Sequence, residues 1–170
     1  GLKELTGKTW NLAFLRDSKL LTHRQREQYY HALGQYSEVK EGIGAVDCNV
    51  IDKMNIHRAT LLAMRRAIES LPQKPDIVLV DGLFPIPDIS YPQECFIRGD
   101  RRIFSIAAAS IIAKVTRDRM MEEYAEKYPE YGFERHKGYG TKFHQTRLVS
   151  FGPSPIHRMS YAPVASLVKV

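Results

Sequence analysis

The sequence has few of the features that would tie a protein to a membrane, an oxidising compartment or a zinc site. Its only two cysteines, Cys48 and Cys95, lie far apart and form neither a metal-binding nor a redox pair, so reduced thiols are expected. The apolar runs are too short to cross a bilayer, and the first residues lack the apolar core of a signal peptide. We therefore expect a cytoplasmic protein that does not bind membranes.

Acidic side chains are missing from the end of the sequence. Residues 135–170 contain six basic residues and three histidines but no Asp or Glu. The rest is balanced, with 12 basic and 12 acidic residues in 1–95 and seven of each in 96–134. The formal net charge of +6 therefore resides in residues 135–170, which we call the basic segment. Because an ordinary solvated face mixes both signs, this segment predicts a surface that binds nucleic-acid phosphates. A basic tail without a binding role is the alternative.

The composition is that of an ordinary globular protein. Of the 170 residues, 44% are apolar and 26% are charged, which excludes disordered and fibrous classes. A chain of this length buries about 70% of its unfolded surface, enough for a sizeable core. No internal repeat or low-complexity linker interrupts it. We expect a monomer with one domain over residues 1–170.

Four segments carry helical signals. Thr22 and Gln25 form a capping box that opens a helix, which Gly34 can close. A second segment repeats apolar residues at helical spacing until Pro72, which cannot continue a helix. A third is apolar all round in its first half, so we expect that half to be buried. The predicted helices span residues 22–34, 55–71, 105–127 and 141–151.

Short β-branched runs between these helices predict strands. Ile77–Val80 is continuous and apolar, and it lies between Pro75 and Gly82, which is typical of a buried, parallel strand. Cys95–Ile97 is a weaker second strand, and Tyr36–Val46 suggests a strand or hairpin. Helices that alternate with strands favour an α/β fold.

Two aspartates follow the predicted strands. Asp81 comes directly after the first strand, and Asp100 follows the second within Ile97-Arg-Gly-Asp100. Ligands of open α/β sheets gather at the carboxyl ends of strands. Two carboxylates held together there repel each other, so they require a cation, and hard oxygen ligands select Mg²⁺ or Mn²⁺. The alternative is turn chemistry, in which Asp81 belongs to an Asp-Gly turn and Asp100 caps the next helix.

A second cluster, His136-Lys-Gly-Tyr-Gly-Thr141, lies in the basic segment. Its glycines let backbone amides approach an anion, and Tyr139 offers a flat ring and a hydroxyl that suit stacking beside a phosphate. A tight loop with a half-buried tyrosine is equally compatible with these residues. Ser18 and Lys19 could likewise contact a phosphate, or serve as a helix cap and a surface charge.

The remaining polar residues give little support to a zinc site or to a catalytic triad. No histidine or cysteine spacing matches a zinc site. No Gly-x-Ser-x-Gly turn accompanies the histidines, which gives no support to a Ser–His–Asp triad. Asp118 lies between Arg117 and Arg119 on a predicted helix, and we expect it in a surface ion pair.

Several motifs together resemble one family, type 2 ribonuclease H, the bacterial ribonuclease HII. They occur in the family's order and cover positions 17 to about 164. The matching blocks are Asp17-Ser-Lys19, Asn55-Ile-His-Arg-Ala-Thr60, Leu79-Val-Asp-Gly82, Arg98-Gly-Asp100, Ser105-Ile-Ala-Ala-Ala-Ser-Ile-Ile-Ala-Lys-Val115 with Arg117-Asp118, Lys137-Gly-Tyr-Gly-Thr141 and Ile156-His-Arg158.

The resemblance implies a ribonuclease H-like fold, with a central mixed sheet flanked by helices and a C-terminal helical segment. It implies cleavage of the RNA strand in RNA–DNA hybrids and incision at single ribonucleotides in duplex DNA, in DNA replication and repair. In the family, four carboxylates hold two divalent ions, Mg²⁺ or Mn²⁺, and the products carry 5′-phosphate and 3′-hydroxyl ends.

The resemblance also assigns residues. Asp81 and Asp100 match the third and fourth carboxylates, and Tyr139 matches the tyrosine that stacks on the deoxyribose after the ribonucleotide. The residues that we expect to contact nucleic acid are Ser18, Lys19, Lys137, Gly138, Tyr139, Lys142, Arg147 and Arg158.

The opening residues depart from the family pattern. The family's first strand carries Gly-Val-Asp-Glu-Ala-Gly-Arg-Gly or a close variant, which supplies two carboxylates and the backbone that reads the 2′-hydroxyl. Here Glu4 can be aligned with the second carboxylate, but Lys3 then replaces the first. We expect the first strands to be lost or replaced within residues 1–14. Because Asp81 and Asp100 alone do not balance two divalent ions, we expect impaired cleavage.

Two alternatives remain. A catalytically silent protein could grip hybrid duplexes through Lys137, Tyr139, Lys142, Arg147 and Arg158. Ribonuclease HIII shares several of the motifs, but it carries an extra N-terminal domain for which this sequence has no room.

Overall fold

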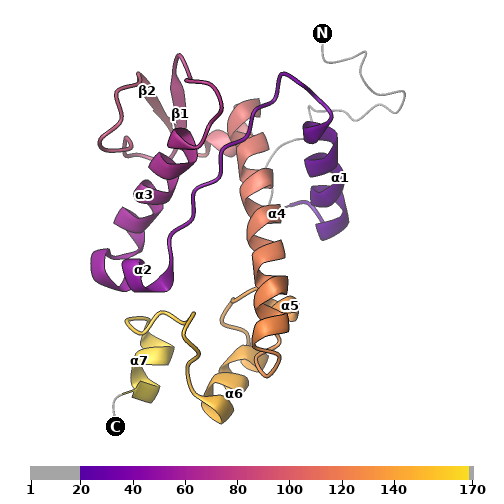
Figure 1. Cartoon of the computed structure of the whole chain (residues 1–170), viewed down its shortest axis with the longest axis vertical. Coiled ribbons are helices and arrows are strands. Elements are labelled where there is room, and N and C mark those ends of the chain that lie inside the picture. The colour runs from indigo at the N-terminus through magenta and orange to yellow at the C-terminus, as the bar shows by residue number, and fades with distance from the viewer. Residues whose placement is uncertain (1–19, 169–170) are drawn as a thin grey trace. The chain divides into compact units, whose positions relative to one another are not determined.

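The computed structural model of the protein describes residues 20–168 (Figure 1). The chain divides into two compact units. Of the described residues, the first contains 20–39 together with Pro75–Pro85 and Tyr91–Lys114. The second contains Lys40–Lys74, Ile86–Ser90 and residues 115–168. No helix within residues 20–168 has the length and apolar character needed to span a membrane. The predicted single domain over residues 1–170 stays a prediction.

The first unit begins with α1 (His23–Gly34), as the capping box predicts. The Thr22 side chain accepts a hydrogen bond from the Gln25 amide, and the Gln25 side chain accepts one from the Thr22 amide at 2.8 Å. Tyr29 and Leu33 are the buried residues of this helix. Two of the orphan amides at the helix start are thereby satisfied.

The sheet of the first unit pairs β1 (Val78–Asp81) with β2 (Gln93–Phe96) (Figure 1). The two strands run parallel, with Asp81 opposite Phe96, so the parallel arrangement predicted for the first strand is confirmed. The Gly82 amide donates to the Phe96 carbonyl at 3.0 Å, which continues the ladder past Asp81. The carboxyl ends of both strands therefore lie at one edge of the sheet.

A short 3₁₀ helix, η2 (Gly99–Arg101), leads from β2 to the long α4 (Phe104–Lys127). The predicted long helix is confirmed, but its burial all round is not. Ile106, Ala107 and Ile111 are buried, whereas Ala109 and Ala113 are exposed. The apolar half of α4 thus buries one face.

In the second unit, α2 (Cys48–Met54) and α3 (Ile56–Glu69) meet at Asn55. Asn55 has φ of 72°, and its side chain accepts from the Arg58 amide at 3.1 Å. One asparagine thus ends α2 and caps α3, because Asn tolerates the left-handed region better than most residues. The helix predicted over 55–71 is confirmed, whereas α2 was not predicted.

The predicted strand or hairpin over Tyr36–Val46 is wrong, since the segment forms no strand. Within the second unit, its later residues lie directly against α3. A Cβ on Gly42 would stand 2.1 Å from the Ala67 carbonyl, and one on Gly44 would stand 2.0 Å from the Ala63 carbonyl. The glycines therefore allow close backbone packing on a helix rather than strand pairing.

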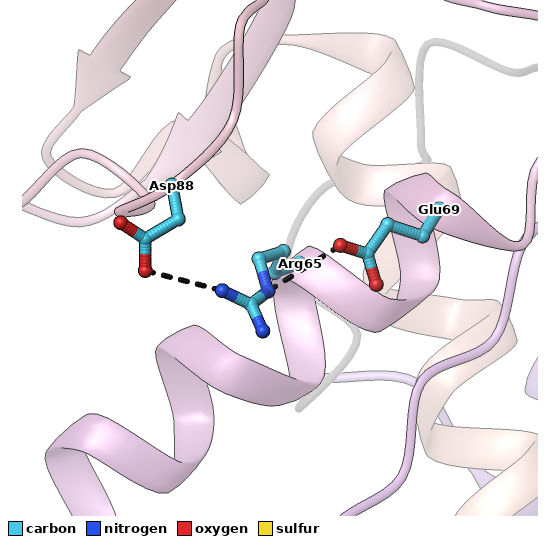
Figure 2. A network of polar contacts seen from close by, with 3 residues as sticks. All are labelled: Arg65, Glu69 and Asp88. Atoms are coloured by element: carbon cyan, nitrogen blue, oxygen red, sulfur yellow. Dashed lines mark hydrogen bonds and ion pairs between the residues drawn. The ribbon is translucent and has the colours of Figure 1, made fainter.

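The 86–90 segment is also tied to α3. Arg65 forms ion pairs with Glu69 on its own helix and with Asp88, at 3.4 and 3.1 Å (Figure 2). The Asp88 and Glu69 side chains are well exposed, so we expect each pair to contribute about 0.2–1 kcal/mol.

The C-terminal part of the second unit contains α5 (Phe133–His136), α6 (Lys142–Phe151) and α7 (Ala162–Val168). Thr141 caps α6, which confirms the helix predicted over 141–151. The buried core here consists of Tyr131, Phe133, Leu148 and Val164.

Asp52 of α2 holds the loop before α7. Its carboxylate accepts hydrogen bonds from the Met159 amide at 2.7 Å and from the amide and hydroxyl of Ser160. The hydroxyl bond, followed by the two amides, lowers the pKa of Asp52 below its usual value. The Cys48 thiol contacts the Pro155 carbonyl at 3.2 Å. Two residues of α2 thus fasten a segment more than 100 positions away.

Candidate functional site

Asp81 and Asp100 are brought to one edge of the sheet. Asp81 ends β1 and is exposed, and its Oδ1 accepts a hydrogen bond from the Gly99 amide at 2.8 Å. Asp100, which directly follows Gly99 in the chain, is only 8% exposed. The bond therefore ties the Asp81 carboxylate to the loop that carries Asp100.

Gly99 is what allows this approach. A Cβ at this position would stand 2.6 Å from Ile106 Cδ1 and 3.2 Å from Phe96 Cβ. Ile106 of α4 is buried and Phe96 of β2 is partly buried, so little room is left here for a side chain. The glycine thus lets the loop pass close enough for its amide to reach Asp81.

The chemistry of this pair fits a divalent cation only in part. Carboxylate oxygens are the donors that Mg²⁺ and Mn²⁺ prefer, and a nearby cation would offset the cost of burying the Asp100 charge. Yet residues 20–168 contain no group of three or more His, Cys, Asp or Glu side chains that could hold a metal ion. Glu4, the third predicted ligand, lies outside the described residues, as do Ser18 and Lys19.

The second predicted cluster forms a tight loop between α5 and α6, which we call the tyrosine loop (Lys137–Thr141). Lys137 and Gly138 both have positive φ, 49° and 79°. The Tyr139 amide donates to the His136 carbonyl and the Thr141 amide to the Tyr139 carbonyl, both at 2.8 Å. Two successive left-handed residues turn the chain sharply and project Tyr139 outward.

Tyr139 is a partly exposed ring beside a cation. Its exposed fraction is 57%, and the Arg117 guanidinium of α4 lies 5.3 Å from the ring centroid. A guanidinium at this distance attracts the ring face through its quadrupole. An exposed aromatic ring supported in this way suits stacking on a sugar or base.

The predicted phosphate ligands take different environments. Lys137 pairs with Glu122 of α4, and its side chain is 15% exposed. Lys142 is exposed at the start of α6. Arg147 lies over the rings of Phe143 and Phe151, and Arg158 over Tyr161. The roles assigned to these residues stay predictions.

Sequence reasoning missed a buried group of histidines beneath the tyrosine loop. His136, His144 and His157, which we call the histidine cluster, are 6%, 9% and 7% exposed. The His144 and His157 Nε2 atoms are 3.1 Å apart, and the His136 and His144 rings stack at 4.1 Å. Three histidines in the basic segment were a visible signal, but no sequence spacing shows that they converge.

Burial keeps two of these imidazoles neutral at pH 7. Desolvation, with smaller contributions from His144 and His136, lowers the pKa of His157 from 6.5 to about 4. Desolvation also lowers the pKa of His144. These histidines therefore add no positive charge to the basic segment near neutral pH.

Asp118 corrects the sequence prediction of a surface ion pair, because only 3% of it is exposed. On α4 it follows the buried residues Ile111 and Val115 by seven and three positions. This spacing places it on the same face of the helix. The helical repeat therefore predicts the burial of Asp118 better than its two charged neighbours do.

Comparison with known proteins places these features in a family. A family model described as Ribonuclease HII matches residues 8–164. The ribonuclease HII of Chlorobium luteolum is 52% identical over 147 residues, which are 86% of this chain and 70% of that protein. The ribonuclease HII of Bacillus pumilus is 50% identical over 155 residues, which are 91% of this chain and 59% of that protein. The chain thus spans less than two thirds of the Bacillus relative.

A solved structure agrees. The crystal structure of the ribonuclease H2 from Pyrococcus horikoshii matches with a TM-score of 0.71 and 25% identity, over 91% of this chain and 80% of that one. The α/β, ribonuclease H-like fold predicted by the resemblance is thereby confirmed. With a family match over nearly all of the described residues, the chain belongs to the ribonuclease HII family.

Proposed function

We propose that the protein is an endonuclease that cleaves the RNA strand of RNA–DNA hybrids and incises duplex DNA at embedded ribonucleotides. The products would carry 5′-phosphate and 3′-hydroxyl ends. Membership of the ribonuclease HII family supports this reaction class. The observation that carries it is the bond from the Gly99 amide to Asp81, which ties the Asp81 carboxylate to the loop that contains Asp100.

Asp81 and Asp100 would hold the divalent ions, Mg²⁺ or Mn²⁺. When bound, such ions activate a water molecule and stabilise the departing 3′ oxygen. The Gly99 amide keeps one Asp81 oxygen in a fixed direction, so the carboxylate is oriented before an ion arrives. Orienting a ligand in advance reduces the reorganisation needed during the reaction.

The basic segment would grip the duplex. Tyr139 would stack on a sugar, while Lys142, Arg147 and Arg158 would face phosphates. Contacts to about six phosphates would weaken binding roughly a thousandfold between 50 and 200 mM salt. We place this activity in DNA replication and repair, in a monomer of the cytoplasm.

A second candidate function is binding of hybrids without efficient cleavage. The basic segment favours it, because residues 135–170 contain six basic residues and no acidic ones. Two carboxylates supply two negative charges against the four positive charges of two divalent ions. We therefore propose that this 170-residue chain binds hybrid duplexes but cleaves them weakly.

A nicking assay tests both functions on duplex DNA that contains one ribonucleotide, with Mg²⁺ and with Mn²⁺. We expect weak cleavage that Asp81→Asn reduces to background while hybrid binding persists. Asp76→Asn, the same change at an exposed position five residues earlier, should leave cleavage unchanged.

Other outcomes separate the proposals. Strong cleavage that Asp81→Asn abolishes would support the catalytic role of the pair and contradict the low activity. Cleavage that survives Asp81→Asn, or the lack of any binding to hybrids, would contradict the proposed nuclease.

A further inference from the structure

Both nitrogens of every imidazole in the histidine cluster have a hydrogen-bond partner. The contacts run from Ser154 through His157 and His144 to the Tyr139 carbonyl. A separate pair of contacts joins His136 to the Gly138 amide and the Tyr131 carbonyl. Since amides only donate and carbonyls only accept, these partners determine where the imidazole protons reside.

The first chain has one direction. The Ser154 amide donates to His157 Nδ1 at 3.0 Å, and the Ser154 hydroxyl lies 2.7 Å from the same nitrogen. Because the amide can only donate, the proton of neutral His157 is on Nε2. At the other end, His144 Nδ1 donates to the Tyr139 carbonyl at 3.0 Å, so His144 Nε2 is left as an acceptor. The His157 Nε2–H therefore donates to His144 Nε2 at 3.1 Å.

His136 is assigned by the same reasoning. The Gly138 amide donates to Nδ1 at 3.2 Å, and Nε2 donates to the Tyr131 carbonyl at 3.0 Å. The histidine cluster thus holds the amide of Gly138, just before Tyr139, and the carbonyl of Tyr139 itself. One bond restrains the backbone on each side of the tyrosine Cα.

We propose that His136, His144 and His157 are positioning residues that fix the backbone of Tyr139 and so orient its ring toward the nucleic acid. The inference rests on the proposed function, in which Tyr139 stacks on the substrate. The tyrosine loop needs such support because Lys137 and Gly138 both hold left-handed conformations and the ring itself is mostly exposed. The hydrogen bonds select one loop conformation among those that a glycine-rich turn can adopt.

Packing alone is the competing explanation, because Phe133 contacts the rings of all three histidines. Leu148 gives a matched control. It lies on α6 like His144 and is 4% exposed in the adjacent core, yet its apolar side chain offers no hydrogen bond to the loop. Leu148→Ala removes packing, His144→Leu removes the bond to Tyr139, and His144→Asn keeps an N–H near the position of Nδ1.

The first test needs no nucleic acid. Nitrogen-15 NMR of the full chain at pH 7 should show the proton of His144 on Nδ1 and those of His136 and His157 on Nε2. In His144→Leu, amide exchange at Gly138, Tyr139 and Thr141 should accelerate about tenfold, whereas Leu148→Ala should leave the exchange of these amides near that of the parent chain. The opposite tautomers, or equal acceleration in both variants, would overturn the proposal even if the chain did not act on hybrids.

The second test is a double-mutant cycle of His144→Leu and Tyr139→Ala, read as the Kd for an RNA–DNA hybrid. We expect His144→Leu to weaken binding about five- to tenfold in the parent chain and less than about twofold in the Tyr139→Ala background. His144→Asn should recover most of the loss, and Leu148→Ala should leave the Kd within about twofold. Independent, additive effects of the two substitutions would show that His144 does not act through Tyr139. Failure of the parent chain to bind hybrids would overturn the proposed function, and the loop measurements would still decide whether the cluster positions the loop.

Discussion

The two candidate sites are held in place in contrasting ways. The Asp81–Asp100 edge depends on the backbone, because two parallel strand ends and the Gly99 amide connect Asp81 to the loop that contains Asp100. The tyrosine loop depends on side chains, since buried imidazoles hold the peptide groups around Tyr139. The carboxylate edge should therefore be sensitive to added volume, and the tyrosine loop to changes in hydrogen bonding and protonation.

Among the substitutions that test this contrast, Gly99→Ala should have the largest effect. The new methyl group would meet Ile106 and Phe96 in a packed region, so we expect the free energy of unfolding to fall by about 1–3 kcal/mol. Any metal-dependent cleavage should fall with it, because the amide would withdraw from Asp81. Denaturant unfolding and the nicking assay measure the two effects.

Gly34→Ala is the control for that substitution, since a Cβ at the end of α1 meets nothing within 4 Å. It should lower neither quantity, since alanine favours a helix at least as well as glycine does. Full stability and cleavage in Gly99→Ala would show that the edge does not depend on close backbone approach.

Gly138→Ala should have the next largest effect. Its φ of 79° is unfavourable for alanine, and a Cβ would stand 3.3 Å from Arg117 Nη2. We expect a loss of about 1–2 kcal/mol in unfolding free energy and weaker hybrid binding. Gly140→Ala, where the nearest atom is 3.9 Å away and φ is not positive, should change both much less. Equal effects of the two substitutions would argue against the left-handed turn as the cause.

Lowering the pH should destabilise the region around the tyrosine loop, by less than the two glycine substitutions do. The unfolded His157 binds a proton near pH 6.5 and the folded one near pH 4. Below pH 6.5 the unfolded state therefore binds more protons, so stability falls as the pH drops from 6.5 toward 4 and does not change above that range through this group. The titratable groups that contact or face the His157 ring are His144, His136 and Tyr131.

Amide exchange between pH 7 and 4.5, corrected for intrinsic rates, measures this loss. Protection should fall first in α6 and the tyrosine loop, while the amides of β1 provide an internal reference. Earlier loss of protection in β1 would contradict a histidine origin.

The smallest effect should be that of Lys142→Ala on hybrid binding. Removing one phosphate contact should lower the slope of log K against log salt by about 1 and leave stability unchanged. Lys53→Ala, at an exposed position on α2, is the control. An unchanged slope would remove Lys142 from the interface.

Local signals predicted much of the fold. The capping box at Thr22, the cap at Thr141 and the apolar run before Asp81 each depend on a few neighbouring residues, and each predicted element forms. The burial predicted for that run holds for Val80, whereas Ile77 is exposed. The pairing of β1 with β2 brings Asp81 close to the loop that contains Asp100. The alternation of helices and strands in the sequence indicates such a sheet.

Features that depend on distant residues could not be predicted in this way. The sequence around Gly42 and Gly44 is typical of a hairpin, but in the structure both glycines lie against α3. Lys137 pairs with Glu122, fifteen positions away. His144 and His157 meet only because α6 and the following loop fold back around Phe133. These contacts between distant residues leave no periodic pattern in the sequence.

The bonds from Asp52 to Met159 and Ser160 also bear on biosynthesis. The second unit joins residues 40–74 to residues 115–168, so α2 is synthesised about a hundred positions before the residues that it binds. At about 5–20 residues per second, a ribosome adds that stretch in roughly 5–20 s. During this interval α2 lacks the loop that Asp52 binds, so its part of the second unit cannot be completed until the last residues of the loop have been made.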